Sequence, residues 1–109
     1  MNSRRTLEQR REHFSFEFAF DGLHYTAGAG FFYDGDLAEL FLTCNKPGSA
    51  AGTAARDGAI AVSIALQHGA SLETLRHALT RLSDGRAAGP VGHALDRIAA
   101  NEQSTKLRK

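Results

Sequence analysis

The sequence predicts an α+β domain in which a three-stranded antiparallel meander is followed by three helices packed on the sheet (βββααα). Two observations carry this prediction. Phenylalanine alternates with smaller or polar residues throughout residues 14–20, which is the period of a half-buried strand. From residue 50 onward the apolar residues recur with the period of a helix, and turn residues separate the segments.

The three predicted strands follow one another through short turns. Asp21-Gly22, directly after the first strand, is a two-residue hairpin turn of the kind that needs positive φ. The second strand is expected over residues 23–32, and two glycines inside it, Gly28 and Gly30, indicate a bulge or a close approach by another backbone. A further turn leads to a third strand over residues 37–44.

A corner at residues 45–49 turns the chain into the first predicted helix, which is expected over residues 50–68 with Gly69 as its stop. Most of this helix is Ala, Ile, Val or Leu, so it needs cover on several sides. Ser71 is expected to cap a second, leucine-rich helix. Pro90 suits the first position of a third helix.

Length and composition limit the class of protein. At 109 residues, with 42% apolar and 23% charged residues, the chain fits one soluble domain. No apolar run is long enough to cross a bilayer, and the arginine-rich start lacks the apolar segment of a signal peptide. The single cysteine, Cys44, excludes an internal disulfide and fits a reducing compartment. We therefore expect a cytoplasmic protein without membrane contact.

Charge is distributed unevenly along the chain, although the net charge is only +1. We expect a folded, mildly acidic body over residues 13–101, a flexible basic arm at 1–12 and a flexible basic tail at 102–109. An acidic body does not attract phosphate backbones. Nucleic acid would therefore be contacted only through the two ends, and such ends are more often simply solvated.

The third predicted strand is apolar on both faces, with Leu37 and Phe41 on one face and Ala38, Leu40 and Leu42 on the other. A three-stranded sheet with helices on one side leaves its other face in water, so the second apolar face needs cover. We predict that a second copy of the chain supplies it in a homodimer, with Leu37, Leu40, Phe41 and Leu42 at the interface. The alternative is that the N-terminal segment folds over this face.

The corner before the first helix is the clearest candidate for a binding site. Backbone amides and the positive end of the helix dipole favour an anion, Lys46 adds charge, and Gly48 allows close approach. It is not a P-loop, because no lysine follows the glycines at the required place. The simpler interpretation is a helix capped by Ser49, with Arg56 and Asp57 in a structural ion pair.

Other candidate groups carry less information. Arg86 lies in a glycine-rich segment, residues 85–92, where it could meet a phosphate, although most such segments are connectors. The five histidines show no metal-ligand spacing and only one cysteine accompanies them, so we predict no metal site. Cys44 has no neighbouring histidine to activate it, and no catalytic residue is predicted.

Several segments, taken together and in order, resemble one protein family. They are GDL at 35–37, ELFL at 39–42, K-x-GS at 46–49, AIAVS at 59–63, ALQHG at 65–69, LETL at 72–75 and GPVG at 89–92. This order is similar to the TSCPD domain, the C-terminal accessory region of adenosylcobalamin-dependent (class II) ribonucleotide reductases. The resemblance covers about residues 22–99.

The resemblance implies an accessory role rather than the reductase reaction itself. Radical reduction of a ribonucleotide needs a thiyl-forming cysteine and a pair of reducing thiols, and one cysteine cannot serve both needs. The SCPD-type cysteine motif is also missing, so the metal-binding role suggested for the family's cysteines does not carry over. No cofactor of its own is expected, and adenosylcobalamin enters only through an associated reductase.

We therefore expect a non-catalytic accessory or regulatory binding module linked to ribonucleotide reductase or nucleotide metabolism. Two alternatives stay open. The first is a small-anion or nucleotide binder that uses the corner at Lys46 and Ser49. The second is a nucleic-acid or protein-partner adaptor of a mobile element or phage that acts through its basic ends.

Overall fold

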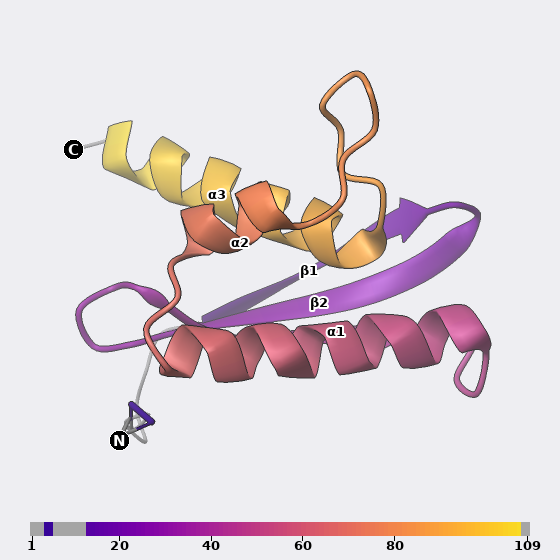
Figure 1. Cartoon of the computed structure of the whole chain (residues 1–109), viewed down its shortest axis with the longest axis horizontal. Helices are drawn as coiled ribbons and strands as arrows, with labels where there is room; N and C mark the ends of the chain where they lie inside the picture. Colours follow the sequence, from indigo (N-terminus) through magenta and orange to yellow (C-terminus); the bar gives the residue numbers. More distant parts are fainter. Residues whose placement is uncertain (1–3, 6–12, 108–109) are drawn as a thin grey trace.

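Three strands form one antiparallel sheet in the order β1-β2-β3, and three helices follow them in the chain (Figure 1). The computed structural model describes residues 4–5 and 13–107. The elements are β1 (His13–Phe20), β2 (Leu23–Phe31), β3 (Leu37–Cys44), α1 (Ala50–Gln67), α2 (Leu72–Ala78) and α3 (Pro90–Leu107). The predicted α+β fold, a meander followed by three helices, is thus the fold of the chain.

The β1–β2 hairpin closes through the turn that the sequence predicted. Asp21 and Gly22 both have positive φ, 49° and 79°, as a two-residue hairpin turn requires. Where β2 pairs with β3, the register shifts between Gly30 and Phe31. A Cβ on Gly30 would lie 2.6 Å from the Glu39 carboxylate, so this glycine also admits a close neighbour. The expected irregularity in the second strand is confirmed.

The core lies between the inner face of the sheet and the helices α1 and α3. Phe14, Phe16, Phe18 and Phe20 project to this face from β1, and their partners on β2 are Ala29, Ala27, Tyr25 and Leu23. From α3, Ala94, Leu95 and Ile98 are fully buried against them. Two of the four phenylalanines of β1 thus oppose alanine, and the other two oppose the larger Tyr25 and Leu23.

His93 of α3 belongs to this aromatic cluster. Its ring centroid lies 4.6 Å from that of Phe18 and 5.7 Å from that of Phe20. Burial lowers the pKa of His93 below its usual value, the charge of Arg97 lowers it further, and Asp96 opposes the shift. The neutral imidazole is therefore the form that the core accommodates.

Helix α1 covers the free edge of β3 through two polar side chains. The hydroxyl of Ser63 accepts a hydrogen bond from the Leu40 N–H (2.8 Å) and donates one to the Leu40 carbonyl (3.0 Å). The amide of Gln67, which is buried, donates to the carbonyl of Ala38 (3.0 Å). Exposed strand edges otherwise offer these backbone groups to other chains. These two polar residues of an otherwise apolar helix thus satisfy backbone groups at the outer edge of the sheet.

The structure changes the interpretation of the predicted interface residues. Leu37, Leu40 and Leu42 are buried at 4%, 1% and 3% exposure, and all three belong to the core of the chain itself. Leu40 and Leu42 lie on the face that α1 covers, and the register shift at the end of β2 pairs Leu37 with Phe31. Only Phe41, at 58% exposure, remains on the outer face of the sheet, where its ring lies over Gly28.

Some residues of the predicted arm and tail are described in the structure. Arg5 donates from its backbone to the Gln67 carbonyl (2.7 Å) and from its side chain to Asp34 (2.6 Å), and its guanidinium lies 3.6 Å from the ring centre of Phe32. Helix α3 continues to Leu107, past the boundary expected at 101. The rest of the predicted arm, residues 1–3 and 6–12, and the last two residues of the predicted tail lie outside the described residues.

No helix in the described part of the chain is long and apolar enough to cross a membrane.

We predict that Ser63→Ala lowers the free energy of unfolding by about 1–3 kcal/mol, because it leaves the buried backbone groups of Leu40 without partners. Urea denaturation followed by circular dichroism measures this change. Thr53→Ala, at an exposed position of the same helix, is the matched control and should change the free energy of unfolding by less than about 0.5 kcal/mol. Equal effects of the two substitutions would contradict a role for Ser63 in covering the strand edge.

A second prediction concerns pH. Because the pKa of His93 is lower in the folded than in the unfolded chain, the unfolded chain binds more protons as the pH falls through about 6.5. Stability should therefore decrease between pH 7.5 and pH 5.5, and His93→Gln should remove part of that decrease. His77→Gln, at an exposed position, should keep the wild-type pH dependence of the urea midpoint.

Candidate functional site

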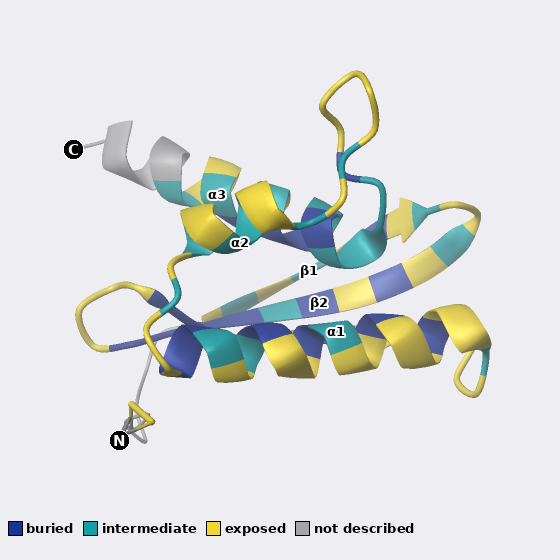
Figure 2. Cartoon of the chain, viewed as in Figure 1, coloured by how far each residue is buried: buried dark blue, intermediate teal, exposed yellow. Residues whose placement is uncertain are grey.

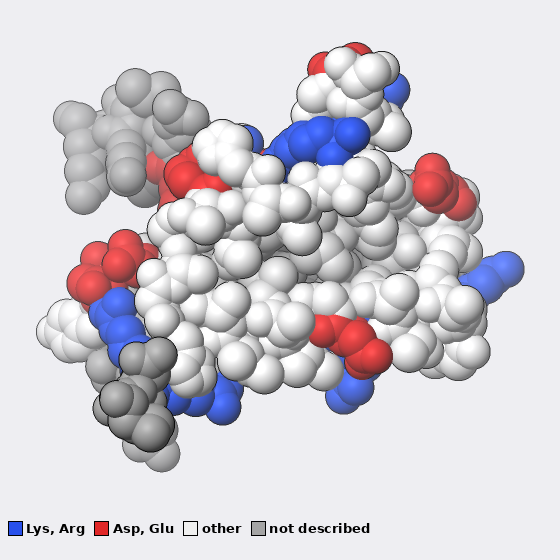
Figure 3. Space-filling model, viewed as in Figure 1, with Lys and Arg blue, Asp and Glu red and all other residues white. Residues whose placement is uncertain are grey.

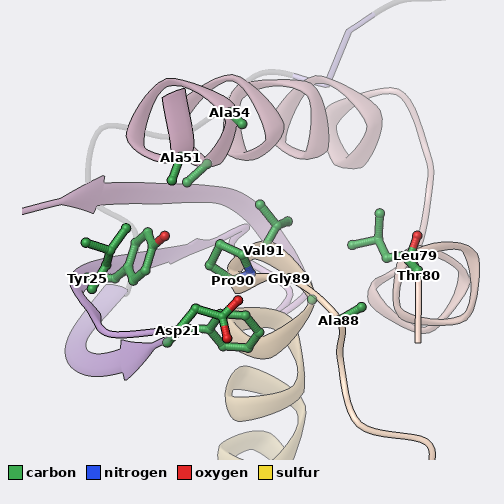
Figure 4. A pocket seen from close by; sticks show the side chains of 14 residues that line it. Asp21, Tyr25, Ala51, Ala54, Leu79, Thr80, Ala88, Gly89, Pro90 and Val91 are labelled. Carbon is green, nitrogen blue, oxygen red and sulfur yellow. The ribbon is translucent and has the colours of Figure 1, made fainter. Parts of the chain in front are cut away.

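An apolar cleft opens between the first half of α1, the β1–β2 turn and the start of α3 (Figure 4). Its volume is about 520 Å³, within the range typical of ligand pockets. The lining residues are mostly small or apolar: Phe20, Asp21, Leu23, Tyr25, Ala51, Ala54, Ala55, Leu79, Thr80, Ala88, Gly89, Pro90, Val91 and Gly92. Four separate segments of the chain thus meet at one concave surface.

Close packing of small residues gives the cleft its shape. A Cβ on Gly58 of α1 would lie 3.0 Å from a methyl group of Val91, so this glycine lets the start of α3 approach α1. A Cβ on Gly92 would lie 3.1 Å from the Cβ of Ala87, which brings the α2–α3 connection against the first turn of α3. Alanine side chains are too short to fill the remaining space. Figure 4 shows Pro90 and Val91 in the middle of the cleft, with Ala51 and Ala54 of α1 on one side.

Three polar groups face this apolar surface. Tyr25 and the turn residue Asp21 lie toward one end of the cleft, and Thr80 lies toward the other (Figure 4). Burial raises the pKa of Tyr25, and its neighbours Cys44 and Asp21 raise it further. The phenol of Tyr25 therefore stays neutral at physiological pH. It serves as a hydrogen-bonding group rather than as a base.

None of the fourteen residues that line the cleft is Ser, Cys, His, Lys or Arg, so the lining holds neither a Ser–His or Cys–His pair nor a cationic group for a phosphate. Among the described residues, no three or more His, Cys, Asp or Glu side chains are grouped where they would hold a metal ion. What the cleft offers is apolar area with one carboxylate near its end.

The predicted anion site at the corner is brought together only in part. Ser49 caps α1 by accepting from the Gly52 N–H (3.0 Å), and its hydroxyl donates to the Lys46 carbonyl (2.7 Å). Gly48, with φ of 87°, lines a hollow of about 130 Å³ together with Arg56. Lys46 and Ser49 do not line that hollow. The corner is thus organised primarily as a helix cap.

Arg86 is not part of that corner. Its guanidinium pairs with Asp84 (2.7 Å), two residues away in the same loop, and Asp84 also accepts from the Arg86 N–H (3.0 Å). In Figure 1 the tip of the loop between α2 and α3 projects away from α1. The structure therefore separates Arg86 from the other predicted anion-binding residues.

An ion-pair cluster that the sequence did not predict joins α2 to α3. Asp96 accepts two hydrogen bonds from Arg81 (2.6 and 2.8 Å) and one from Arg76 (2.9 Å), and Arg76 also pairs with Glu73 (2.8 Å). The hydrogen bonds from Arg81, followed by those from Arg76, lower the pKa of Asp96, although burial opposes them. Glu73 and Arg76 form a helical pair at i and i+3, but no periodic spacing links them to Arg81 and Asp96, so no pattern in the sequence indicated that the cluster joins α2 to α3.

The cleft was missed for a different reason. Its two main contributors, the alanine-rich helix and the glycine-rich segment at 85–92, are visible in the sequence, but nothing there shows that they meet.

No protein-family model, no curated protein and no solved structure matches this chain. The candidate site is therefore defined by the geometry of this chain alone.

The ion-pair cluster yields a prediction for stability. Asp96→Asn should lower the free energy of unfolding at pH 7 by about 1–3 kcal/mol, because hydrogen bonds to two arginines lose their charge. Because the folded-state pKa of Asp96 is depressed, its contribution is complete above the usual carboxyl pKa of about 3.9 and disappears as the pH falls below it.

The urea midpoints of the wild type and Asp96→Asn should therefore converge at acidic pH. Asp84→Asn removes the carboxylate of the exposed pair with Arg86 and serves as the matched control, with a much smaller effect at pH 7. A difference between the wild type and Asp96→Asn that persists unchanged at pH 3 would contradict the electrostatic explanation.

Proposed function

We propose that this chain is a non-catalytic, cytoplasmic accessory module that binds an apolar group of a protein partner in the cleft between α1 and α3. The observation that carries the proposal is the cleft itself. It has a volume of about 520 Å³, and its mostly apolar lining contains no Ser, Cys, His, Lys or Arg. Such a surface suits recognition through buried apolar side chains. The carboxylate of Asp21 favours a partner with a cationic group beside its apolar anchor.

The process in which the module acts is proposed from the sequence. The ordered resemblance to the TSCPD region supports ribonucleotide reduction or nucleotide metabolism, with a class II ribonucleotide reductase as the first partner to test. The chain itself carries out no reductase step in this proposal, because its one cysteine is buried against the start of α1 and has no second thiol. Adenosylcobalamin would belong to the partner.

The proposal predicts that filling the cleft abolishes partner binding. Ala54 is exposed on α1 and lines the cleft, so Ala54→Phe should occupy the space without disturbing the core. We expect the wild type to retain a class II reductase at micromolar concentration in a pull-down, and Ala54→Phe to lose at least about tenfold in affinity. Ala19→Phe, an equal change at an exposed position outside the cleft, should bind as the wild type does.

No retention of the reductase by the wild type would remove that partner from the proposal. Binding that is unaffected by Ala54→Phe would remove the cleft as the binding surface. Melting curves of both variants establish that each is folded.

The alternative function, anion or nucleotide binding at the corner, is favoured by one observation: Gly48 and Arg56 line the same small hollow. It has less support than the cleft, because the hydroxyl of Ser49 is engaged in capping and Lys46 lies outside that hollow. Titration with inorganic phosphate or dNTPs tests it through the backbone amide resonance of Gly48. The adaptor function depends on the basic ends, which lie mostly outside the described residues.

A further inference from the structure

The turn between β2 and β3 and the end of α1 together hold the side chain of Arg5. Its guanidinium lies 3.6 Å from the ring centre of Phe32, donates to Asp34 (2.6 Å) and lies 3.9 Å from the carboxylate of Asp36. The backbone N–H of Arg5 also donates to the carbonyl of Gln67, the last residue of α1 (2.7 Å). A guanidinium that lies over an aromatic face and beside carboxylates is the arrangement by which proteins recognise arginine.

The turn that receives the arginine is held in place by its own hydrogen bonds. The Phe32 N–H donates to the Asp36 carbonyl (2.8 Å), and the Gly35 N–H donates to the Phe32 carbonyl (2.9 Å). One oxygen of the Asp34 carboxylate accepts from the Asp36 N–H (3.0 Å), which leaves the other oxygen for the guanidinium. The bond from Asp36, followed by the one from Arg5, lowers the pKa of Asp34, so this carboxylate is charged at neutral pH. Because none of the backbone bonds involves Arg5, the turn does not require the arginine for its shape.

The surroundings of the site have room for more than one side chain. A hollow of about 330 Å³ continues from Arg5 to the start of α2, and its lining includes the carboxylates of Asp36, Glu73 and Glu102. Figure 2 shows the β2–β3 turn exposed beside the buried ends of its strands, and Tyr33 in this turn is 87% exposed. In Figure 3 basic and acidic atoms lie side by side at the left of the view, where this turn lies. An exposed aromatic residue beside a charged site is typical of surfaces that bind other proteins.

No other described arginine combines an aromatic face with a carboxylate. Arg97 lies over an aromatic ring of β1, 4.8 Å from its centre, and forms no ion pair with a described residue. Arg86 pairs with Asp84 and has no described ring beside it. The ion pair expected between Arg56 and Asp57 is not formed, since neither pairs with another described residue. Within the described chain, the combination of ring and carboxylates is thus particular to the β2–β3 turn.

We propose that the β2–β3 turn, with Phe32, Asp34 and Asp36, is an arginine-binding site that Arg5 fills from the same chain and that an arginine-containing peptide of a protein partner fills when Arg5 leaves. The arginine held in the structure defines the chemistry that fits, which is a planar cation that stacks on the ring and donates to carboxylates. Exchange is favoured because the contacts of Arg5 are individually weak, since its side chain and that of Asp34 are 45% and 54% exposed. The site is separate from the cleft, which lies at the other end of α1.

Competition from Arg5 determines how tightly a peptide must bind. A group on the same chain acts at an effective concentration on the order of 10 mM. If a single arginine binds the empty site with a dissociation constant of about 1 mM, Arg5 fills the site for about nine tenths of the time and weakens a competitor about tenfold. A peptide with further contacts, such as one that also covers Tyr33, overcomes this competition. Arg5 thus excludes isolated arginine side chains and admits a matching segment.

Nuclear magnetic resonance of the full chain tests the proposal with N-acetyl-arginine amide as the probe. Arg5→Ala empties the site, and we expect the amide resonances of residues 32–36 to titrate with a dissociation constant of about 1 mM. The wild type should bind at least about tenfold more weakly, because Arg5 competes. Asp34→Asn, added to Arg5→Ala, should weaken binding at least about fivefold, because the charge is lost while the oxygen that accepts from Asp36 is kept. N-acetyl-lysine amide should bind at least about threefold more weakly, since it has no planar cation to stack.

A peptide and a control variant complete the test. The peptide SRRTL, the sequence of residues 3–7 blocked at both ends, should bind Arg5→Ala at least about threefold more tightly than the single amino acid, because its backbone adds contacts. Arg86→Ala is the matched control, since it frees the Asp84 carboxylate, which accepts a similar backbone bond but has no described ring beside it. The amino acid should bind there at least about threefold more weakly than at the β2–β3 turn.

Four results would overturn the proposal: no binding to Arg5→Ala at about 50 mM probe, equal affinities of Arg5→Ala and the wild type, equal affinities for the arginine and lysine amides, or a peptide that binds no more tightly than the amino acid. Urea denaturation confirms that each variant is folded, and Arg5→Gln repeats the titration with a longer side chain in place of alanine.

Discussion

The arrangement of the molecule depends on the hydrogen bonds that Ser63 and Gln67 of α1 form with the outer edge of β3. They hold α1 along the edge of the sheet by satisfying backbone groups of Ala38 and Leu40 that are buried and have no neighbouring strand. A buried backbone group without a partner is costly, so a position of α1 that broke these bonds would be disfavoured. Because α1 lies at the edge, only part of its circumference faces the sheet. Its remaining apolar surface must lie in the cleft or in solvent.

The space that α1 leaves beside it is shaped by residues without long side chains. A Cβ on Gly52 would lie within 3.3 Å of Cys44, Ser49 and the Lys46 backbone. The start of α1 therefore packs tightly on the corner. Gly58 does the same for Val91 at the start of α3. Between these two close contacts the helix presents Ala54 and Ala55 to the cleft, and their short side chains leave it open. Tight packing at both ends and short side chains between them thus produce a defined hollow.

The order of elements could be predicted because its signals are local. The alternation of phenylalanine in β1, the Asp21-Gly22 turn and the Ser49 cap each act over a few residues, and the structure confirms all three. The burial of Leu40 and Leu42 within the chain could not be predicted, because it depends on where α1 lies and so on contacts more than twenty residues apart. The Asp96 cluster is equally non-local: its two arginines lie fifteen and twenty residues away, across an irregular loop. Local pattern determines the elements, and tertiary pairing determines which faces remain available.

A single helix thus presents two apolar surfaces of different character. The cleft side is concave and lined by alanine, and suits an inserted side chain. The opposite side carries Ile60 and Ile64, which are exposed to solvent. Because the carboxylate of Asp21 lies beside the cleft alone, a ligand with both an apolar and a cationic group finds matching partners there. In the proposed function the small domain would thus act by recognition at the cleft.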